Sequence, residues 1–370
     1  MKYFLIAGEA SGDLHGSNLI KAIKQTDPNA TFNFWGGDLM QQQSEGLVMH
    51  YKQVTIMGFV EVVLNIRSIF KNLETCKKQI LDFKPDVVIL IDYPGFNLRI
   101  AEFCKQNGIK TTYYIAPKIW AWKENRGKKL EKFVDQLLLI FPFEVSYFKK
   151  WQVNSLYVGN PLIDAIASHK PNHEFKSQNN ALNKPVIALL PGSRKQEIAK
   201  ILPLMLQVIT QFPDYQFIIA GAPGINPSFY QPYLNPQVTV VYGQTYDLLQ
   251  NAEGAIVCSG TATLETALFN VPQVCGYVAN PISYRIAKLL VKNIKYISLV
   301  NLCLNKPAIT ELIQHDFTVN NMTTELKAIL PGGAKHKALM QDYLKLQQDL
   351  GGVGASTKAA QAIIRLAEQK

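Results

Sequence analysis

The chain has 370 residues, of which 48% are hydrophobic and 18% charged, and its formal net charge is +10. This length fits two domains of ordinary size, and the apolar content excludes a largely disordered chain. The positive charge is spread along the chain and suits anionic partners such as nucleotides, phosphorylated lipids or an acidic membrane surface. No helix-turn-helix, zinc-finger or RNA-binding motif accompanies it, so no nucleic-acid partner is expected.

The five cysteines are scattered and form no CxxC pair, which argues against a disulfide framework and against a structural zinc site. No apolar run approaches the roughly 20 residues that a membrane-spanning helix needs. The first apolar run ends at Gly8 and is too short for a secretory signal, so it is expected to be a core strand. These features predict a cytoplasmic protein.

Short apolar runs alternate with helical stretches, which is the pattern of βαβ units and a parallel sheet. In the first half the expected strands are residues 3–7, 33–36, 87–91, 111–115, 136–140 and 155–158. After a polar segment the pattern starts again, with expected strands at residues 186–190, 216–220, 238–242, 254–258 and 273–277. The prediction is an α/β protein with two doubly wound, Rossmann-like domains that face a central cleft.

The domain boundaries follow from this restart of the pattern. The first domain is expected over residues 1–165, a linker or surface loop over 166–183, and the second domain over 184–345. Residues 346–370 are expected to form a helical tail. Open parallel sheets bind ligands beyond the carboxyl ends of their strands, so the ligand is expected in the cleft between the two sheets.

The first expected strand leads directly into the loop GEASGDLHG at residues 8–16. Gly8 and Gly12 permit a tight turn and a close approach of the backbone to a ligand, and the helix N-terminus that follows favours an anion or a polar group. Ser11 and Asp13 are therefore candidate ligand contacts in the same loop. The alternative is an ordinary strand–helix turn in which Ser11 or Asp13 caps the helix.

Asp92 follows the apolar strand expected over residues 87–91, at the edge where open α/β sheets carry active sites. Loss of hydration at such a place raises the pKa of a carboxyl group towards the range of a useful general base. Asp92 is therefore the candidate catalytic base, and capping of the next helix is its alternative role. Asp13 and His15 are the next candidates for the base.

In the second half, the sequence LPGSRKQE at residues 190–197 joins a strand to a helix. Gly192 and Ser193 offer backbone and hydroxyl hydrogen bonds, Arg194 offers a planar cation, and the helix dipole adds partial positive charge. Together with Glu197 they form a candidate cradle for a diphosphate that needs no metal. The alternative is an exposed arginine in a surface loop.

The sequence SGTATLE at residues 259–265 opens another expected helix. Ser259, Gly260 and Thr261 would present hydrogen-bond donors to a phosphate group. Glu265 lies about one helical turn beyond Thr261 on the same side, where a carboxylate can accept both hydroxyls of a ribose. The alternative is a charged side chain that faces solvent.

A helix expected over residues 57–71 carries an apolar stripe at helical spacing. The apolar side chains of this stripe are Met57, Phe59, Val63, Ile66 and Phe70. Arg67 and Lys71 flank the stripe. Such a stripe either packs on the core, which is the commoner case, or binds acyl chains and an anionic membrane surface.

Eight motifs occur in the order in which one known family carries them. They are GEASGD at 8–13, IMGFVEV at 56–62, IDYPGFN at 91–97, PKIWAW at 117–122, FPFE at 141–144, LPGSR at 190–194, SGTATLE at 259–265 and SLVNL at 298–302. The chain resembles the lipid-A-disaccharide synthase family in all of them. The resemblance implies a glycosyltransferase of the GT-B fold that takes UDP-2,3-diacylglucosamine as donor and 2,3-diacylglucosamine 1-phosphate as acceptor. It also implies peripheral association with the inner membrane.

The resemblance places the family's catalytic aspartate on Asp92, the arginine of its LPGSR motif on Arg194, and an asparagine of its second domain on Asn301. We therefore add Asn301 to the expected UDP and diphosphate contacts. Gly95 stands where the family's IDxPDFN-like pattern has an acidic residue, so a second carboxylate is missing at that point. The resemblance further implies that the first domain binds the lipid acceptor and the second binds the UDP-sugar.

No metal ion or other cofactor is expected, because no cluster of His, Cys, Asp and Glu has the spacing of metal ligands. The main alternative is another UDP-N-acetylglucosamine enzyme on the same scaffold, either a cell-wall transferase or a sugar-nucleotide epimerase. A cell-wall transferase would be expected to begin with a GGTGGH-like loop, and this chain has GEASGDLHG there. A third hypothesis is a binding module without enzymatic activity for nucleotide sugars or anionic lipids.

Overall fold

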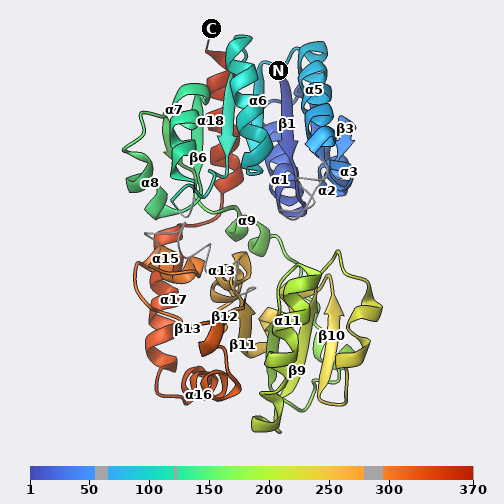
Figure 1. Cartoon of the computed structure of the whole chain (residues 1–370), viewed down its shortest axis with the longest axis vertical. Coiled ribbons are helices and arrows are strands. Elements are labelled where there is room, and N and C mark those ends of the chain that lie inside the picture. Colours follow the sequence, from blue (N-terminus) through green and yellow to red (C-terminus); the bar gives the residue numbers. More distant parts are fainter. Residues whose placement is uncertain (55–65, 121–122, 279–294, 370) are drawn as a thin grey trace. The chain divides into compact units, whose positions relative to one another are not determined.

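The computed structural model describes residues 1–54, 66–120, 123–278 and 295–369. The chain divides into two compact units, one made of Met1–Asp164 together with Gly351–Lys370, the other of Ala165–Leu350. Each unit is a parallel sheet with helices packed against it (Figure 1). Within the described residues, every helix is too short or too polar to span a bilayer.

The sheet of the first unit has the strand order β3-β2-β1-β4-β5-β6-β7, and its paired strands are parallel. Its strands are β1 (Lys2–Ala7), β2 (Thr31–Gly36), β3 (Leu47–His50), β4 (Val87–Ile91), β5 (Thr111–Tyr114), β6 (Gln136–Leu139) and β7 (Ser155–Tyr157). The direction of strand progression reverses between β1 and β4. This reversal is the topological switch point at which doubly wound sheets bind their ligands.

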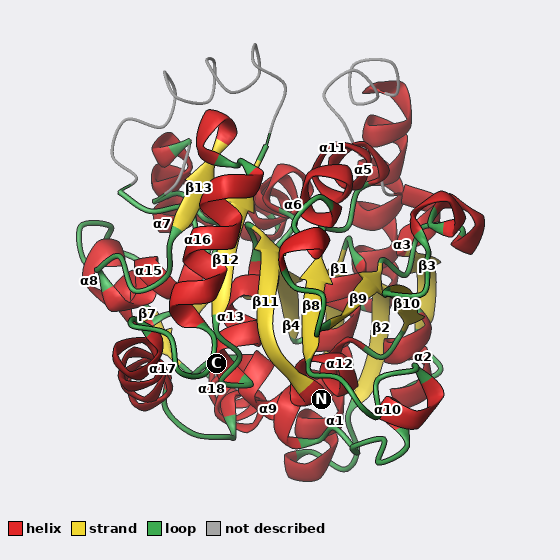
Figure 2. Cartoon of the chain, turned by 90° about the horizontal axis from the view of Figure 1, so that it is seen from below, coloured by secondary structure: helices red, strands yellow, loops and turns green. Residues whose placement is uncertain are grey.

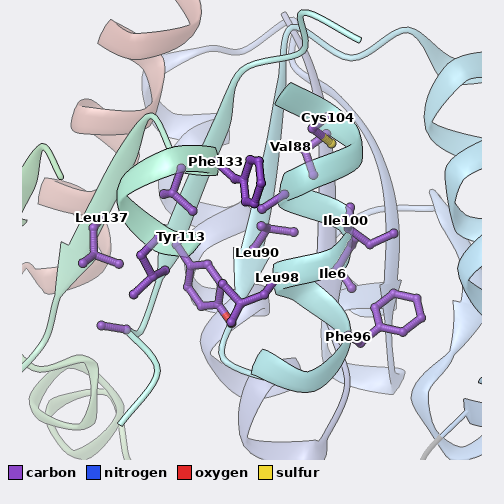
Figure 3. Packing of buried hydrophobic residues seen from close by; sticks show 14 of the residues in the cluster. Ile6, Val88, Leu90, Phe96, Leu98, Ile100, Cys104, Tyr113, Phe133 and Leu137 are labelled. Carbon is purple, nitrogen blue, oxygen red and sulfur yellow. The ribbon is translucent and has the colours of Figure 1, made fainter. Parts of the chain in front are cut away.

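The helices of the first unit connect these strands, except for the C-terminal helix, which follows the last strand of the chain. They are α1 (Ala10–Thr26), α2 (Asp38–Gln43), α3 (Tyr51–Val54), α5 (Ile66–Phe83), α6 (Pro94–Gln106), η1 (Glu124–Arg126), α7 (Gly127–Phe133), α8 (Pro142–Phe148) and α18 (Ala355–Glu368). The apolar faces of β4, β5 and α6 meet in the core, where Leu90, Tyr113 and Leu98 are buried close together (Figure 3). The strand β4 is buried along its whole length, as expected for a parallel strand between layers of helices.

The C-terminal helix α18 belongs to the first unit, although the helix before it belongs to the second. It packs along α1, and the side chain of Lys110 donates to the backbone oxygens of Leu366 and Ala367 at 3.1 and 3.2 Å. The carboxylate of Asp164 accepts the backbone N–H groups of Gly354 and Ser356 at 2.6 and 2.8 Å, which fixes the start of the helix. The tail therefore completes the first unit.

The sheet of the second unit has the order β10-β9-β8-β11-β12-β13, also with parallel pairing. Its strands are β8 (Val186–Leu190), β9 (Gln216–Gly221), β10 (Val238–Tyr242), β11 (Ala252–Cys258), β12 (Gln273–Tyr277) and β13 (Glu311–Ile313). Helices α12 (Thr245–Asn251), α13 (Thr261–Leu268) and α16 (Val319–Ile329) pack against its strands (Figure 2). The remaining helices are α10 (Phe175–Gln178), α11 (Lys195–Leu206), η2 (Ile209–Gln211), η3 (Pro227–Phe229), η4 (Gln231–Tyr233), α15 (Leu299–Leu304), η5 (Gln314–Asp316) and α17 (His336–Leu350).

The predicted class, two doubly wound α/β units with a helical tail, is confirmed, and each of the eleven expected strands occurs. The edge strands β3 and β13 were not predicted, because each is short and only partly buried. The segment 166–183, expected to be a linker or surface loop, contains the end of α9 (Pro161–Ala167) and the helix α10. Its Phe175 is fully buried and anchors the segment to the core of the second unit.

Candidate active site

The first unit places Asp92 immediately after β4, beside the switch point of its sheet. Ala7 pairs with Ile91, and Ile91 pairs with Tyr114, so the loops that follow β1, β4 and β5 leave the same edge. Ligands bind to open parallel sheets at this edge. The half-buried Asp92 therefore occupies the position that its strand predicts for an active-site group.

The backbone at Asp92 is strained. Asp92 and Tyr93 have φ angles of 42° and 48°, in the left-handed region that residues with a Cβ atom rarely adopt. The side chain of Asn97 donates to the Asp92 carbonyl oxygen at 2.8 Å, and the Tyr113 hydroxyl donates to the same oxygen at 2.5 Å. Strain of about 1–3 kcal/mol per residue persists only where the surroundings enforce it, and it is concentrated at functional sites. The cap of α6 is Tyr93, so Asp92 is not the helix cap that was its alternative role.

Burial raises the pKa of the Asp92 carboxyl group above its usual range. Lys118 and Arg126 oppose this rise through their positive charges, whereas the negative charge of Glu9 adds to it. A carboxylate with a raised pKa is a stronger base, yet it is still ionised near neutral pH if the rise is moderate. The electrostatic surroundings of Asp92 thus suit a group that accepts a proton from a hydroxyl.

Two glycines of the loop after β1 allow close packing. A Cβ atom on Gly8 would lie 2.4 Å from the ring of Tyr93, and a Cβ atom on Gly12 would lie 3.1 Å from that of Ala7. The first turn of α1 therefore packs directly against the sheet and beside the strained turn at residue 92. Ser11 is exposed on that first turn, and the capping position is held by Glu9.

The two reserve candidates for the base are buried in the fold. Asp13 accepts the backbone N–H groups of Gly37, Leu39 and Met40 at 2.7, 3.0 and 3.0 Å, so both of its carboxylate oxygens are engaged at the start of α2. His15 is buried as well, and burial lowers its pKa to about 4, which leaves the imidazole neutral near pH 7. Asp13 stabilises the start of α2, His15 is a buried neutral side chain of α1, and neither residue caps α1.

In the second unit, the loop after β8 contains Gly192 with φ 109°, and α11 begins just after Arg194, which occupies the capping position. The side chains of Ser193 and Arg194 are exposed. A Cβ atom on Gly192 would lie 2.3 Å from the carboxylate of Glu197, so the glycine leaves room for that side chain. Glu197 also lies beside Cys258 and, together with burial, raises the pKa of its thiol. The Glu197 side chain therefore lies between the Gly192 turn and Cys258.

The loop after β11 leaves the sheet next to the loop after β8, because Val257 pairs with Leu190. Gly260, with φ 150°, precedes α13, and Thr261 is exposed at the first position of this helix. Ser259 and Gly260 are partly exposed beside it. The N-termini of α11 and α13 consequently lie at the same edge of the sheet, an arrangement that suits an anion.

Glu265 lies on α13 and is not a charge that simply faces solvent. Burial raises the pKa of its carboxyl group, and the hydroxyl of Tyr246 donates a hydrogen bond of 3.1 Å to its Oε1 atom. The side chain is half-buried, so part of the carboxylate can still receive other donors. A ribose with two adjacent hydroxyls is a ligand of suitable chemistry.

Asn301 is buried on α15, and its side chain is used within the fold. The amide nitrogen donates to the Ile309 carbonyl and to the Glu311 carboxylate, both at 2.9 Å, and the amide oxygen accepts the N–H of Ile309 at 2.9 Å. Glu311 also accepts the hydroxyl of Ser298 at 2.7 Å. A direct contact between Asn301 and a diphosphate would have to break some of these bonds.

The apolar stripe expected over 57–71 is only partly described. Met57, Phe59 and Val63 lie outside the described residues, as does the side chain of Ile66, the first residue of α5. Phe70 is 56% exposed, and Arg67 and Lys71 beside it are exposed too. The core-facing side chains of α5 are instead Leu73, Cys76 and Ile80. For Phe70, the alternative of core packing is therefore wrong.

Among the described residues, no three His, Cys, Asp or Glu side chains are grouped closely enough to hold a metal ion. The five cysteines are free, and four of them are buried. The positive charge offered at the loop edge of the second unit comes from Arg194, Lys195 and the two helix N-termini.

Comparison with known proteins identifies the family. The model of the lipid-A-disaccharide synthetase family matches residues 3–364. The lipid-A-disaccharide synthase of Coxiella burnetii (strain CbuK_Q154) is 35% identical over 98% of this chain and 97% of its own length. That of Geobacter metallireducens is 33% identical over 100% of this chain and 98% of its own. The chain belongs to the lipid-A-disaccharide synthase family.

Solved structures of other enzymes share the fold of this lipid-A-disaccharide synthase family member. UDP-GlcNAc 2-epimerase from Neisseria meningitidis, bound to UDP-GlcNAc, matches 99% of the chain and 100% of its own with a TM-score of 0.68 at 13% identity. The calicheamicin glycosyltransferase CalG4 matches 99% of both chains with a TM-score of 0.60 at 12% identity. These likenesses concern the fold alone and confirm the predicted GT-B class, while the family membership confirms the predicted enzyme class.

Within this family member, the FPFE motif has a structural role that the sequence analysis did not assign. Glu144 is fully buried and accepts the backbone N–H groups of Ile140 and Phe141 at 3.2 and 3.1 Å and the indole N–H of Trp120 at 3.2 Å. Burial raises the pKa of Glu144 to about 7. The carboxylate thus ties the PKIWAW loop after β5 to the end of β6. The signal was a glutamate at the third position of a helix, where it can form a capping box.

Proposed function

We propose that this chain is an inverting glycosyltransferase that joins UDP-2,3-diacylglucosamine to 2,3-diacylglucosamine 1-phosphate. The products are lipid A disaccharide 1-phosphate and UDP. The observation that carries the proposal is the family match over residues 3–364, which includes both candidate loop edges. The first unit supplies the acceptor site, with Gly8, Ser11 and Gly12 beside it, and the second unit supplies the UDP-sugar site.

Asp92 acts as the general base. It takes the proton of the acceptor 6-hydroxyl while that oxygen attacks C1 of the donor sugar, and the bond from C1 to the UDP oxygen breaks. A single displacement turns the α-linked donor into a β-linked product, so no covalent sugar–enzyme intermediate is needed. The raised pKa of Asp92 supports this role, because proton transfer is efficient when the pKa of the base approaches the working pH.

The departing UDP gains negative charge, which the second unit neutralises. The guanidinium of Arg194 and the N-termini of α11 and α13 supply positive charge, and Ser193, Ser259 and Thr261 supply hydrogen bonds. Asn301 acts indirectly, by holding Ile309 and Glu311 through its side-chain amide. This set provides the charge without a metal ion, so turnover is expected to persist in excess chelator.

Replacement of Glu265 by alanine is expected to weaken UDP binding by about one to two orders of magnitude. Two hydrogen bonds from the ribose to a charged carboxylate are lost, at a cost on the order of 1.5–3 kcal/mol. Calorimetric titration with UDP measures the effect. Glu253→Ala, which removes an exposed carboxylate at the amino end of β11, is the control and should bind normally. An unchanged affinity of Glu265→Ala would exclude this helix from the nucleotide site.

Phe70, Arg67 and Lys71 are proposed to touch the anionic surface of the inner membrane from the cytoplasmic side. Insertion of the exposed Phe70 ring and attraction of the two cations both favour binding to acidic lipids. Phe70→Ser is expected to weaken binding to anionic vesicles about tenfold to hundredfold, since burial of a phenylalanine contributes roughly 1.5–3 kcal/mol. Sedimentation with vesicles at low and high salt measures it.

The control for the membrane contact is Leu344→Ser, which alters an equally exposed apolar side chain of α17, 57% accessible, in the second unit. It should leave vesicle binding unchanged. Equal binding by wild type and Phe70→Ser would remove α5 from the membrane contact. Loss of the folded state in Phe70→Ser is not expected, because the ring lies outside the core.

The activity itself is tested by incubating the protein with the donor alone and with donor and acceptor together. The proposal predicts release of UDP only when the acceptor is present, with a disaccharide as the second product. A sugar-nucleotide epimerase would instead convert the donor without any acceptor. Tight binding of both substrates without turnover would support a binding module and contradict the proposal.

A further inference from the structure

We propose that Tyr246 is a positioning residue for Glu265: its hydroxyl orients the carboxylate, so that Glu265 can accept the ribose hydroxyls of UDP. This inference rests on the UDP site proposed above. Tyr246 is the second residue of α12, on the chain that follows β10, whereas Glu265 belongs to α13 after β11. The two helices thus contribute different parts of one nucleotide contact.

Two neighbouring rings, those of His169 and Phe269, pack against the ring of Tyr246. The ring of His169 meets it edge to face, with centroids 5.5 Å apart at 89°, and the ring of Phe269 lies 5.3 Å away at 49°. Because the ring is held, its hydroxyl points to the Glu265 Oε1 atom, with the oxygens 3.1 Å apart. That contact leaves Oε2 of Glu265 available for a ligand.

His169 is itself held in place by a second carboxylate. Its Nε2 atom lies 2.9 Å from Asp247 Oδ1, and the same oxygen accepts the backbone N–H of Asn172 at 2.8 Å. Residues 169–172 follow α9 directly at the start of the second unit. The segment at the start of the second unit therefore packs against the Tyr246 ring through His169.

The surroundings of Tyr246 make its hydroxyl a hydrogen-bond donor to Glu265. Burial and the neighbouring carboxylate raise the pKa of Tyr246, so its hydroxyl remains protonated and donates. Burial also raises the pKa of Glu265, and the bond from Tyr246 lowers it. The ionised form accepts ribose hydroxyls, so a lower Glu265 pKa extends UDP binding to lower pH.

Other groups around α13 do not replace this donor. The helix also packs against β11, β12, α15 and α17. Their buried titratable groups include Cys258, Cys275 and Tyr343, whose pKa values are all raised by burial, so these groups are neutral near pH 7. On α12, Asp247 is paired with His169.

The test is titration of UDP into Tyr246→Phe and wild type between about pH 5.5 and 8.5. The affinity of the variant is expected to fall about threefold to tenfold at the alkaline end, since one hydrogen bond to the carboxylate is lost. The loss should grow towards acidic pH, because Glu265 in the variant takes up a proton at a higher pH than in wild type. Protonation of UDP itself affects both proteins equally, so it cancels in the ratio of the two affinities.

Two controls separate positioning from a purely structural role. Tyr343→Phe removes another buried tyrosine hydroxyl of the same unit, one that accepts from Gln273 at 3.1 Å, and should show no pH-dependent change in UDP affinity. With 2′-deoxy-UDP, which lacks one of the two hydroxyls, the effect of Tyr246→Phe should shrink. When Glu265→Gln is also present, the effect of Tyr246→Phe on UDP affinity should no longer depend on pH.

A loss that is independent of pH and equal for UDP and 2′-deoxy-UDP would overturn the positioning role. An unchanged UDP affinity in Tyr246→Phe would overturn it as well. The failure of the wild type to bind UDP at any pH would instead contradict the proposed nucleotide site and this inference together. The affinities and their pH dependence thus distinguish a failure of the inference from a failure of the proposed function.

Discussion

Asp92→Asn is expected to lower kcat by about 10²–10⁴, the range for loss of a general base, with the affinity for UDP nearly unchanged. Asparagine keeps the size of the side chain and tolerates the left-handed backbone, so the strained turn held by Asn97 and Tyr113 should persist. The amide cannot accept the proton of the acceptor hydroxyl. Steady-state rates with both substrates, together with a UDP titration, measure the two quantities.

The pH dependence of kcat is a second test of Asp92 as the general base. In the wild type, kcat should fall as the pH decreases through the Asp92 pKa, which burial raises above the usual range of an aspartate. In Asp92→Asn this acidic limb should disappear from the residual rate. Asp82→Asn, an exposed aspartate on α5, is the matched control and should keep both the rate and the limb. Near-normal turnover by Asp92→Asn would exclude Asp92 as the base.

Asp13→Ala is expected to destabilise the protein by about 3 kcal/mol. The substitution leaves the buried N–H groups of Gly37, Leu39 and Met40 without their acceptor, and each unsatisfied donor costs on the order of 1–3 kcal/mol when the site cannot admit water. Denaturant unfolding, followed by the fluorescence of Trp35 next to this region, measures the loss.

The matched control for Asp13 is Asp38→Ala at the exposed start of α2, which should leave the unfolding midpoint nearly unchanged. At a temperature where Asp13→Ala is still folded, its turnover should approach that of wild type. A stable but inactive Asp13→Ala would show that Asp13 participates in the chemistry, contrary to the bonds that engage it. The expected result separates the roles of Asp13 and Asp92, since Asp92→Asn is expected to lower the rate without affecting stability.

The strands could be predicted from the sequence because buried parallel strands are continuous apolar runs. Residues 87–91 are VVILI and are buried throughout, and the same holds for VIALL at 186–190. The edge strands β3 and β13 have mixed composition and few residues, so pairing with a neighbour decides their structure. Gly46 illustrates this, since a Cβ atom there would lie 1.8 Å from the Phe32 carbonyl oxygen, a contact that only tertiary structure reveals.

Candidate site residues could be predicted from the sequence where they follow the end of a strand or begin a helix. Asp92 directly follows β4, Arg194 caps the helix after β8, and Glu265 lies one turn into the helix after β11. The partners of these residues come from elsewhere in the chain. In the sequence Tyr113 looks like a core residue of a strand and Tyr246 like an ordinary aromatic residue. Their hydroxyls nevertheless donate to the Asp92 carbonyl oxygen and to the Glu265 carboxylate.

Asp13 shows the limit of such positional reasoning. Its place in a glycine-rich loop after the first strand is typical of a ligand contact, but the start of α2 supplies three N–H groups that engage both carboxylate oxygens. The sequence separation between Asp13 and residues 37–40 hides this interaction from motif analysis. Asn301 is similar, because its partners at 309 and 311 lie beyond the end of its own helix.

The central claim is a single inverting transfer between two lipid-linked sugars, and product analysis tests it most directly. The protein is incubated with α-linked UDP-2,3-diacylglucosamine and 2,3-diacylglucosamine 1-phosphate, and the new glycosidic bond is assigned by the proton coupling constant at C1. We predict one UDP released for each disaccharide formed and a β-configured bond to the acceptor 6-oxygen. An α-configured product, or UDP release without disaccharide, would contradict the proposed mechanism.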